Sequence, residues 1–460
     1  MNALLSTAIS GVVLMFVGLF AKNKQAIKYF AIAALLVAFA ANFVDLRYVL
    51  KMGPYTAYVS MIKVSLFTAL FNAVILGCTL VYFLLSGSEF EKVGENVAEY
   101  FSLQFFILSG IMLATSFNNL LILFLAIEII SIPQYILAGS DKHNLKSNEA
   151  SLKYFLMGAF STGILLMGIV LIYGGCGSFE LDRLGIGGLS MSPLTLCGIL
   201  LIVFSLSFKV SAAPFHFWTP DVYDGSPTVF TAFMATVVKA GGFIAFIRLF
   251  HIAFQGGIVN QQWTLVLEVI TAATLIIGNV TAVYQQSVKR MLAYSSIAQA
   301  GFMLFSVLAF NLRAQQGILL YAAAYSLATI GAFSVLLKMK DYTFDGFNGL
   351  ARKQPLLAFS MTIFLFSLAG IPLTGGFFAK YFVLTAVVQQ GDMFWLVIVA
   401  IICAAISVYY YFKVIIAMYF KPGNPEVEEP ASAYKAMLLV TVALLLLMGI
   451  FPNLLLHFLK

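Results

Sequence analysis

The chain has 460 residues, of which 62% are hydrophobic and only 10% are charged. A soluble domain is close to half apolar and a quarter charged, so this composition excludes an ordinary soluble enzyme. The net charge of +7 is spread over short loops and forms no basic, aromatic-studded patch, which argues against nucleic acid as a partner. Apolar runs of about twenty residues recur from end to end and predict an all-α integral membrane protein in a lipid bilayer.

About fourteen membrane-spanning helices are expected along the chain. The first apolar run, Leu4 to Phe20, has no basic segment before it and is followed by many more spans, so we interpret it as a transmembrane helix and not a cleaved signal. In chain order the spans are expected to start near residues 3, 26, 60, 100, 119, 149, 193, 227, 262, 290, 315, 355, 392 and 432. An even number of spans places both ends of the chain on one side.

The basic residues of the loops predict the orientation of the chain. Cytoplasmic loops of membrane proteins carry an excess of lysine and arginine. With both termini on the periplasmic side, the larger basic group, including Lys142, Lys289 and Arg290, lies in the cytoplasm. The smaller group on the opposite side is chiefly Arg47, Lys51, Arg248 and Arg313. Termini on the periplasmic side are therefore predicted.

Two segments of the chain echo each other. Phe-Ser-Leu-Ser precedes Pro214, and Phe-Ser-Leu-Ala precedes Pro372. Each proline removes a backbone donor and is expected to break its helix inside the membrane. The predicted division is a three-helix segment, two five-span repeats and a last span, at 1–99, 100–251, 262–420 and 432–460. An odd number of spans per repeat makes the two copies inverted, which is an architecture typical of transporters.

Glu128 and Lys209 are ionisable residues deep within two of the apolar spans. A charge in the membrane interior costs several kcal/mol, roughly 3 or more, so such residues predict a function. Burial alone would protonate the glutamate, but a nearby lysine reverses this preference. We predict that the pair loads and unloads a proton as its separation changes. The alternative is a static ion pair that fixes two helices.

Lys239 and Lys380 are the other two buried charges. Lys239 lies about halfway along its span, before a Gly-Gly pair that allows close helix packing, and is predicted to be a central proton relay. Its alternative is a lysine that reaches a helix end. Lys380 follows the second helix break and is predicted to be a terminal proton donor. Its alternative is a lysine whose ammonium extends to the membrane surface.

Further polar residues near the first break are candidates for auxiliary roles. His216 can relay protons near physiological pH, or it is simply hydrogen-bonded at the membrane surface beside Trp218. Glu149 and Lys153 have the i,i+4 spacing of a local helix pair, and an inward-facing Lys153 is the functional alternative. Asp221 and Asp224 are expected in the turn after the break.

Cysteine and histidine are too scattered for a metal or redox centre. Each occurs four times, and no pair has the close spacing of a zinc, haem or iron–sulfur motif. We therefore expect no metal and no cofactor in this chain, and redox chemistry is expected in another subunit.

The run from Ser205 to Pro227, which reads Ser-Leu-Ser-Phe-Lys-Val-Ser-Ala-Ala-Pro-Phe-His-Phe-Trp-Thr-Pro-Asp-Val-Tyr-Asp-Gly-Ser-Pro, resembles the seventh-helix motif of the antiporter-like subunits of respiratory complex I. Residues 288–301 and 370–380 match further motifs of that family, as does Glu128 within Ala-Ile-Glu-Ile-Ile-Ser-Ile-Pro. The resemblance covers essentially the whole chain. The Thr-Pro-Asp-Val-Tyr turn and Lys380 are typical of the N-type branch of bacterial NADH–quinone oxidoreductases.

The resemblance implies a proton-translocating subunit of the bacterial inner membrane, driven by electron transfer from NADH to quinone in other membrane and peripheral subunits. Flavin, iron–sulfur clusters and quinone are implied there, and neighbouring antiporter-like subunits are implied as direct partners. Glu128 and Lys209 would form the switch, Lys239 the relay and Lys380 the exchange site, with His216 as an auxiliary relay. Gln299 stands where some relatives carry histidine, which would leave the relay there to water.

Three other functions fit many of the same residues. A subunit of a multi-component cation/proton antiporter shares the fold and most charges, and so does a subunit of a ferredoxin- or hydrogenase-linked pump. A passive scaffold would use the buried ion pairs only to hold helices together. The scaffold predicts that removal of Lys239 or Lys380 impairs assembly and leaves pumping per complex intact.

Overall fold

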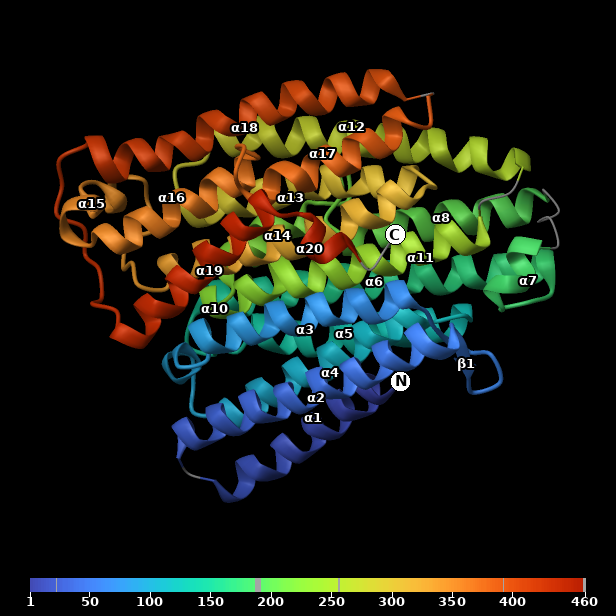
Figure 1. Ribbon diagram of the computed structural model, residues 1–460, viewed down its shortest axis with the longest axis horizontal. Coiled ribbons are helices and arrows are strands. Elements are labelled where there is room, and N and C mark those ends of the chain that lie inside the picture. Colours follow the sequence, from blue (N-terminus) through green and yellow to red (C-terminus); the bar gives the residue numbers. More distant parts are fainter. Residues whose placement is uncertain (22, 187–191, 255–256, 392, 458–460) are drawn as a thin grey trace.

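Long helices that run side by side build the protein (Figure 1). The computed structural model describes residues 1–21, 23–186, 192–254, 257–391 and 393–457. In this part of the chain, twelve helices are long and apolar enough to cross a membrane. Two further spans are interrupted, one made of α8 and α9 and the other of α16 and α17. Counting each interrupted helix once, the described residues contain the expected fourteen spans.

The first half of the chain extends to the end of the first interrupted span and the helix after it. Its elements are α1 Asn2–Phe20, α2 Lys24–Met52, β1 Tyr55–Ala57, β2 Ile62–Val64, α3 Leu66–Ser86, η1 Glu89–Lys92, α4 Val97–Ser116, α5 Leu120–Ala138, α6 Leu145–Cys176, α7 Leu181–Ile186, α8 Pro193–Lys209, α9 Trp218–Gly225, α10 Thr228–Phe233, η2 Met234–Val238 and α11 Lys239–Ala253. Of these, η2 is one turn of π-helix between α10 and α11.

The second half holds the remaining spans and the second interruption. Its elements are α12 Gly257–Val283, α13 Val288–Leu308, α14 Leu312–Leu336, η3 Asp345–Phe347, α15 Leu350–Lys353, α16 Pro355–Ala369, α17 Gly375–Val388, α18 Phe394–Phe420, α19 Ser432–Ile450 and α20 Asn453–Leu456. The start of α1 and the end of α19 both lie toward the side of the molecule that carries α7 and the β1–β2 hairpin (Figure 1). This shared side agrees with an even number of spans.

Two local expectations were wrong. The third span begins at Leu66 and not near residue 60, because residues 55–64 form an antiparallel hairpin in which Tyr55 pairs with Val64. Gly53, at φ +83°, and Pro54 end the preceding helix and turn the chain into this hairpin. Asp221 and Asp224 lie within helix α9 and not in a turn.

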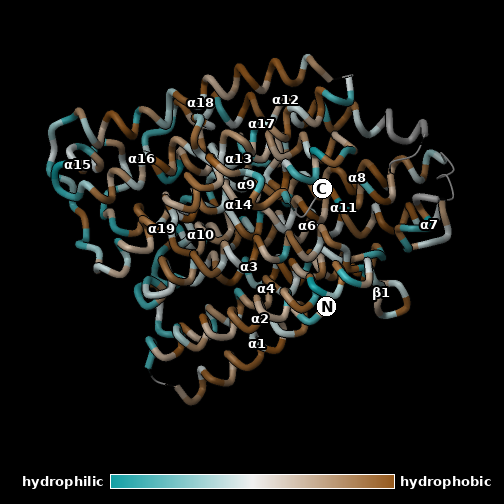
Figure 2. The backbone as a smooth tube through the Cα atoms, in the orientation of Figure 1, coloured by the Kyte–Doolittle hydropathy of each residue, from teal (hydrophilic) through white to brown (hydrophobic). Residues whose placement is uncertain are grey.

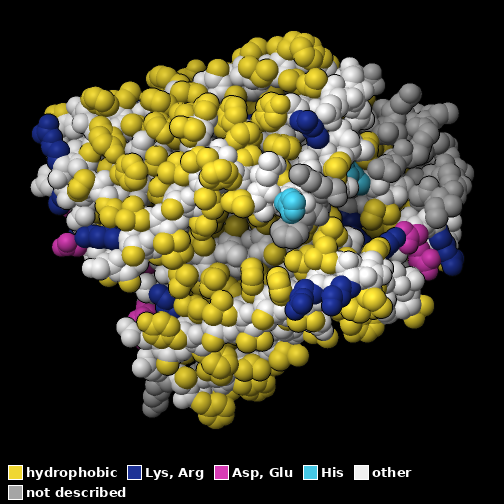
Figure 3. Space-filling view, in the orientation of Figure 1, with side chains coloured by type: hydrophobic (Ala, Val, Ile, Leu, Met, Phe, Trp, Pro, Cys, Tyr) yellow, Lys and Arg dark blue, Asp and Glu magenta, His cyan; other side chains and the backbone are white. Residues whose placement is uncertain are grey.

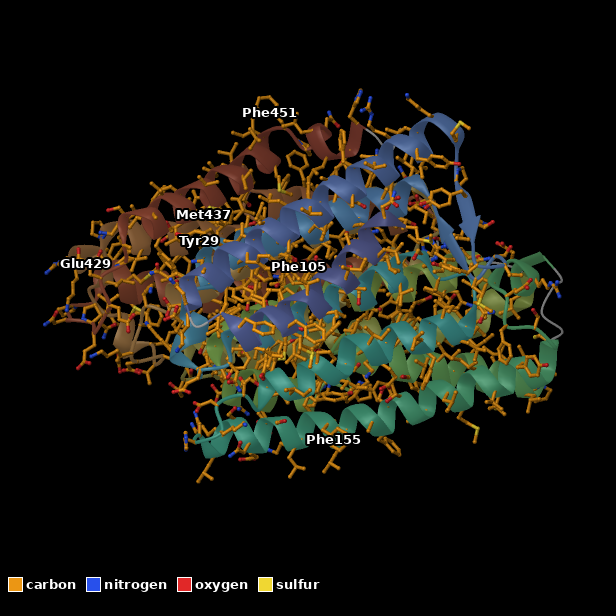
Figure 4. The ribbon with its side chains drawn as sticks, turned by 90° about the horizontal axis from the view of Figure 1, so that it is seen from below. Tyr29, Phe105, Phe155, Glu429, Met437 and Phe451 are labelled. Atoms are coloured by element: carbon orange, nitrogen blue, oxygen red, sulfur yellow. The ribbon has the colours of Figure 1, made fainter. Side chains whose placement is uncertain are left out.

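The core is formed by the helices in the middle of the bundle. The spans Thr228–Ala253 and Leu312–Leu336 are buried along their whole apolar windows, whereas α1 and α2 are mostly exposed. Phe155 of α6 is 51% exposed and points away from the bundle, while Phe105 of α4 is buried within it (Figure 4). Hydrophobic residues run along the helices and hydrophilic ones gather at the connecting loops (Figure 2). The visible outer face is correspondingly apolar over its middle, as expected of a lipid-facing surface (Figure 3).

The packing order of the first five central spans recurs in the second five. In the first set α4 packs on α5, α5 on α6, α6 on both α8 and α9, and α4 on α11. In the second set α12 packs on α13, α13 on α14, α14 on both α16 and α17, and α12 on α18. The division into two repeats at 100–251 and 262–420 stays a prediction.

Both interrupted spans are built by the local backbone that the prolines and glycines allow. The chain leaves α8 through Ser211, at φ +66°, and then passes Pro214 before α9 begins. It leaves α16 through Gly370, which takes a left-handed φ of +85° as the C-cap, and passes Pro372 before α17 begins. The last carbonyl groups of α8 and α16 therefore end inside the bundle, where side chains can reach them.

An ionic cluster joins three loops at the end of the molecule opposite the hairpin. Glu89 accepts hydrogen bonds from Lys338 and Lys92, and Lys92 also bonds to Glu428 in the loop before α19, close to the labelled Glu429 in Figure 4. The hydrogen bond from Lys92 holds the pKa of Glu428 below its ordinary value. The cluster ties the N-terminal three-helix segment to the C-terminal part of the chain.

Arg248 is a further difference from the sequence expectation, which placed it among the outer basic loop residues. It is buried in α11, where its Nε donates to the Phe117 carbonyl at 2.6 Å and its Nη2 to the Lys63 carbonyl at 3.0 Å. The guanidinium therefore joins β2 of the hairpin to the C-terminal end of α4 and holds both against α11.

Candidate functional site

Lys239 lies near the centre of the bundle, at the start of α11 and directly after the π-helical turn η2. The side chain is 2% exposed, and its Nζ donates to both the carbonyl and the hydroxyl oxygen of Ser296 on α13, the carbonyl at 2.9 Å. A π-helical turn is rare and often marks a functional position. Here its Ala235 carbonyl accepts a hydrogen bond from the Tyr325 hydroxyl at 2.9 Å.

The partners of Lys239 are neutral. Besides Ser296, the ring of Tyr223 from α9 lies 5.8 Å from Nζ, and no acidic side chain forms an ion pair with this lysine among the described residues. The Lys239 ammonium is therefore held by dipoles and a ring and by no counter-charge among the described residues. The predicted position halfway along a buried span agrees with this geometry.

Lys380 lies on α17, just after the second interruption. It is 7% exposed, and its Nζ donates to the carbonyl oxygens of Leu368 and Ala369 at 2.9 and 2.8 Å. These two carbonyls are at the C-terminal end of α16, where the helix dipole favours a cation. The Phe302 ring lies 4.7 Å from the same nitrogen. The side chain points into the bundle, so the surface-reaching alternative does not describe it.

Gln299 and three hydroxyl residues form a hydrogen-bond network that includes the Leu368 carbonyl, which also accepts from Lys380. The Gln299 Nε2 donates to the Leu368 carbonyl at 2.8 Å and to the Tyr411 hydroxyl at 3.2 Å, and its Oε1 accepts from Tyr321. Tyr411 also shares a hydrogen bond of 2.5 Å with Ser295. The sequence pointed to Gln299 only as a departure from relatives, and it gave no signal for Tyr321 or Tyr411, which lie on α14 and α18.

Lys209 is the last residue of α8 and is half-buried. Its Nζ donates to the Ser131 hydroxyl at 2.9 Å and to the Tyr135 hydroxyl at 3.4 Å, both on α5. Glu128 lies one turn before Ser131 on the same helix, but it forms no direct ion pair with Lys209 in the described part of the chain. The predicted switch between them stays a prediction.

The short helix α9 lies between the first interruption and Lys239. Its Trp218 donates from Nε1 to the Phe208 carbonyl at 3.1 Å and stacks on Tyr154 with ring centroids 4.5 Å apart. The Trp218 ring also contacts Tyr223, at 5.9 Å between centroids. Trp218 and Tyr223 of α9 thus form a series of ring contacts from Phe208, next to Lys209, to the Lys239 ammonium.

His216 is buried in the connection between α8 and α9 and stacks on the neighbouring Phe217 ring at 4.7 Å. Its Nδ1 has no hydrogen-bond partner within the described residues. The buried position differs from the surface alternative, and the auxiliary relay role of His216 stays a prediction.

The predicted pair of Glu149 and Lys153 forms, with 2.7 Å between the charged atoms, and it extends to α9 and α13. Lys153 also pairs with Asp221 at 2.9 Å, and Asp221 pairs with Arg290 at 3.0 Å. Next to it, the buried Lys289 donates to the carbonyls of Asp224 and Ser226. Lys289 and Arg290 therefore bind α13 to α9, in addition to the predicted part of these basic residues in orienting the chain in the membrane. No group of three or more possible metal ligands occurs among the described residues.

A helical membrane protein with two interrupted spans and a row of buried lysines belongs to the class of ion-translocating membrane proteins. A family model described as NADH:quinone oxidoreductase/Mrp antiporter, TM, matches residues 117–407. NADH-quinone oxidoreductase subunit N of Cytophaga hutchinsonii is 41% identical over 410 residues, 88% of this chain and 89% of the relative. The chain belongs to this family of antiporter-like membrane subunits.

Two further comparisons agree over the whole length. NADH-quinone oxidoreductase subunit N of Flavobacterium psychrophilum is 37% identical and covers 100% of both chains. A chain in the structure of respiratory complex I from Thermus thermophilus with bound aureothin is 30% identical, with a TM-score of 0.85 over 99% of this chain and 98% of that chain. These comparisons confirm the resemblance, including its N-type branch, and the predicted fold class.

Proposed function

We propose that this chain is the proton-translocating N-type membrane subunit of a bacterial NADH:quinone oxidoreductase. The observation that carries the proposal is Lys239, a buried lysine held by Ser296 with neutral partners, together with a second buried lysine, Lys380, held by backbone carbonyls at the second helix break. Charges of this kind are expensive to bury in a membrane without a use. Glu128 and Lys209 supply the entry switch of the proposed path, and Lys380 its exchange site.

The electron-transfer steps are proposed to occur in partner subunits. NADH, flavin, iron–sulfur clusters and quinone would be bound there, by membrane and peripheral subunits of the same complex. The subunit would lie in the inner membrane with both termini on the periplasmic side. A native gel of solubilised membranes tests the assembly: the chain should migrate with a very large band that oxidises NADH.

Lysine variants in the assembled complex test the proton path. Lys209→Ala and Lys239→Ala should lower the number of protons moved per NADH oxidised in proteoliposomes, while the complex still assembles. Lys435→Ala is the control, because Lys435 pairs with the exposed Glu429 at 3.7 Å, outside this path. Unchanged stoichiometry in both lysine variants would refute the proposal and favour the passive scaffold.

A cation/proton antiporter subunit is the second candidate, because the matching family joins oxidoreductases and Mrp antiporters in one description. The identity to relatives named subunit N favours the oxidoreductase. Migration apart from NADH oxidation, together with sodium-dependent growth at high pH, would favour the antiporter. Migration with a ferredoxin- or hydrogen-oxidising activity would favour a pump linked to those donors.

A further inference from the structure

A groove of about 650 Å³ runs along the outside of the bundle at the end that carries the β1–β2 hairpin. It lies where α2 and α11 end and where α3 and α14 begin, which is the level at which membrane-spanning helices reach the membrane surface. Most of its walls are apolar, and Leu50 and Leu312 on two of these walls are 53% and 51% exposed. The groove is therefore open to the surroundings of the protein.

The same pair of helices, α3 and α14, lines a second groove of about 330 Å³. Val74 in this groove lies seven residues beyond Phe67 on α3, and Ala323 lies eight residues beyond Gln315 on α14. At 1.5 Å per residue, the second groove is about 10–12 Å deeper in the membrane. Its described lining residues are all apolar, and α19 and α20 form its far wall beside α3 (Figure 1). We call the two grooves together the α3–α14 seam.

Positive charge gathers at the rim of the first groove. Arg47 and Lys51 occupy the last two turns of α2 next to Leu50, and both are exposed. In the described part of the chain, neither side chain forms an ion pair or a hydrogen bond. Arg248 lines the groove itself and donates only to carbonyl and hydroxyl oxygens, among them the Phe117 carbonyl. These three cations therefore have no bound counter-charge among the described residues.

The nearby carboxylates of Asp45 and Asp182 are bound by other groups. Asp45 of α2 is buried and pairs with the Met1 amino group at 2.7 Å. Asp182 of α7 pairs with Lys63 at 3.0 Å. The rim of the groove thus presents positive charge at the level where the phosphate groups of a bilayer lie.

We propose that an anionic phospholipid binds in the α3–α14 seam, with its phosphate at Arg47 and Lys51 and an acyl chain in the grooves. A basic site between membrane helices is a typical headgroup site, and guanidinium and ammonium groups are strong donors to phosphate oxygens. The apolar grooves accommodate an acyl chain, which a water-soluble anion lacks. The bound lipid would join α2 and α3 of the N-terminal segment to α11 and α14. It is a partner separate from the proton path.

The test uses phosphatidylglycerol with a photoreactive diazirine in one acyl chain, in proteoliposomes of the whole complex that contains this chain. After illumination, crosslinks to α3 and α14 are mapped by mass spectrometry. Crosslinks to the exposed face of α6 around Phe155 serve as the reference for unbound lipid. Relative to this reference, we expect an excess of unlabelled phosphatidylglycerol to remove the α3 and α14 crosslinks. The same excess of phosphatidylcholine should leave them.

Arg47→Gln and Lys51→Gln test the headgroup site. A basic residue near the membrane surface changes the binding of an anionic lipid roughly fivefold, so each variant should lower the α3 crosslinks by about that factor when the probe is below saturation. Lys421→Gln is the matched control, because Lys421 is also exposed at the end of a span, α18, and has no ion pair in the described chain. It lines neither groove.

Leu50→Trp tests the groove by filling it with a larger side chain. Leu36→Trp is its control, because Leu36 is 50% exposed on the same helix and lies outside both grooves. We expect fewer α3 crosslinks in the Leu50 variant and the wild-type number in the Leu36 variant. The two glutamine variants decide the question if Leu50→Trp does not assemble.

Equal competition by phosphatidylcholine would overturn the inference, because it would show ordinary boundary lipid. Equal effects of Lys421→Gln and the two rim variants would overturn it as well, and so would wild-type crosslinking in an assembled Leu50→Trp complex. A wild-type complex without α3 and α14 crosslinks would also refute it and would indicate that a neighbouring subunit covers the seam. None of these readouts depends on proton pumping, so the proposed function is tested separately.

Discussion

The two interrupted helices hold their lysines in different ways. At the first break, Lys209 ends the first half-helix and donates to side-chain hydroxyls of another helix, Ser131 and Tyr135. At the second break, Lys380 lies on the second half-helix and donates to two backbone carbonyls at the end of the first half. Two similar sequence segments thus produce two chemically distinct sites.

The difference lies in what each partner can do when the lysine changes its protonation state. A hydroxyl can rotate and become a donor to a neutral amine, whereas a carbonyl can only accept. The carbonyls at the end of α16 therefore favour a charged Lys380, with support from the helix dipole. The hydroxyls around Lys209 suit both states. The first break therefore holds its lysine by groups that both donate and accept, and the second by groups that only accept.

Arginine at the two lysine positions gives the largest expected effect. Arginine can donate to the same hydroxyls or carbonyls, but it stays protonated in proteins. We expect Lys209→Arg and Lys380→Arg to pump as poorly as the alanine variants, measured as protons per NADH in proteoliposomes. Normal pumping by Lys380→Arg would show that the second break needs only a fixed positive charge. Lys209 would then be a proton relay, and Lys380 a structural cation.

Loss of the Lys209 partners should have an intermediate effect. A hydrogen bond to a charged group contributes about 1.5–3 kcal/mol, so Ser131→Ala should slow proton pumping by roughly 10- to 150-fold. Tyr135→Phe removes a longer contact, 3.4 Å against 2.9 Å, and should have a smaller effect. Initial rates of proton uptake in proteoliposomes measure both. The reverse order would mean that Tyr135 is the main partner of Lys209.

Gly370→Ala tests the backbone of the second break. At φ +85° an alanine costs roughly 1–2 kcal/mol, and its Cβ would lie 2.9 Å from the Lys380 Cδ. We expect lower thermal stability of the complex and a displaced Lys380. Gly163→Ala in α6 is the control, because a Cβ there meets open space and should stabilise the helix by about 0.5–1 kcal/mol. Equal stability of the two variants would contradict the assigned role of Gly370.

The smallest expected effect comes from the ionic cluster around Glu89 and Glu428. Unlike the two breaks, this cluster lies outside the spans, and its loss should change stability. The pKa of Glu428 lies below its ordinary value of 4.5, so its ion pair stabilises the fold above that pH and is lost as the pH falls through the lowered value. The pair is exposed, so the contribution is about 0.2–1 kcal/mol.

Thermal unfolding of wild type and Glu428→Gln measures this contribution. The difference should be present at pH 7 and should be lost as the pH falls below 4.5 through the lowered pKa of Glu428. Glu426→Gln is the control, because its pair with Lys340 is longer, at 3.4 Å, and more exposed. A difference that grows on acidification would show the opposite sign and refute the assignment.

Much of the fold could be predicted because its signals are local. An apolar run long enough to cross the membrane is visible in the sequence, and so are Pro214 and Pro372, which interrupt two of the runs. The third span was the exception among the early helices, since Gly53 and Pro54 begin a hairpin that an apolar window does not reveal. The sequence also placed Asp221 in a turn, whereas it lies in α9. This short helix packs against α6 and α13, and such contacts are not visible in a local sequence window.

The sequence by itself determined the spans, the two breaks and the identity of the buried charges. These follow from the cost of exposing backbone or burying charge in hydrocarbon, which each segment bears on its own. Only the tertiary structure decided the partners of those charges. Lys239 meets Ser296 across 57 residues, Lys209 meets Ser131 across 78, and Tyr411 meets Ser295 across 116. Such pairs depend on how whole helices pack, and no local pattern records that.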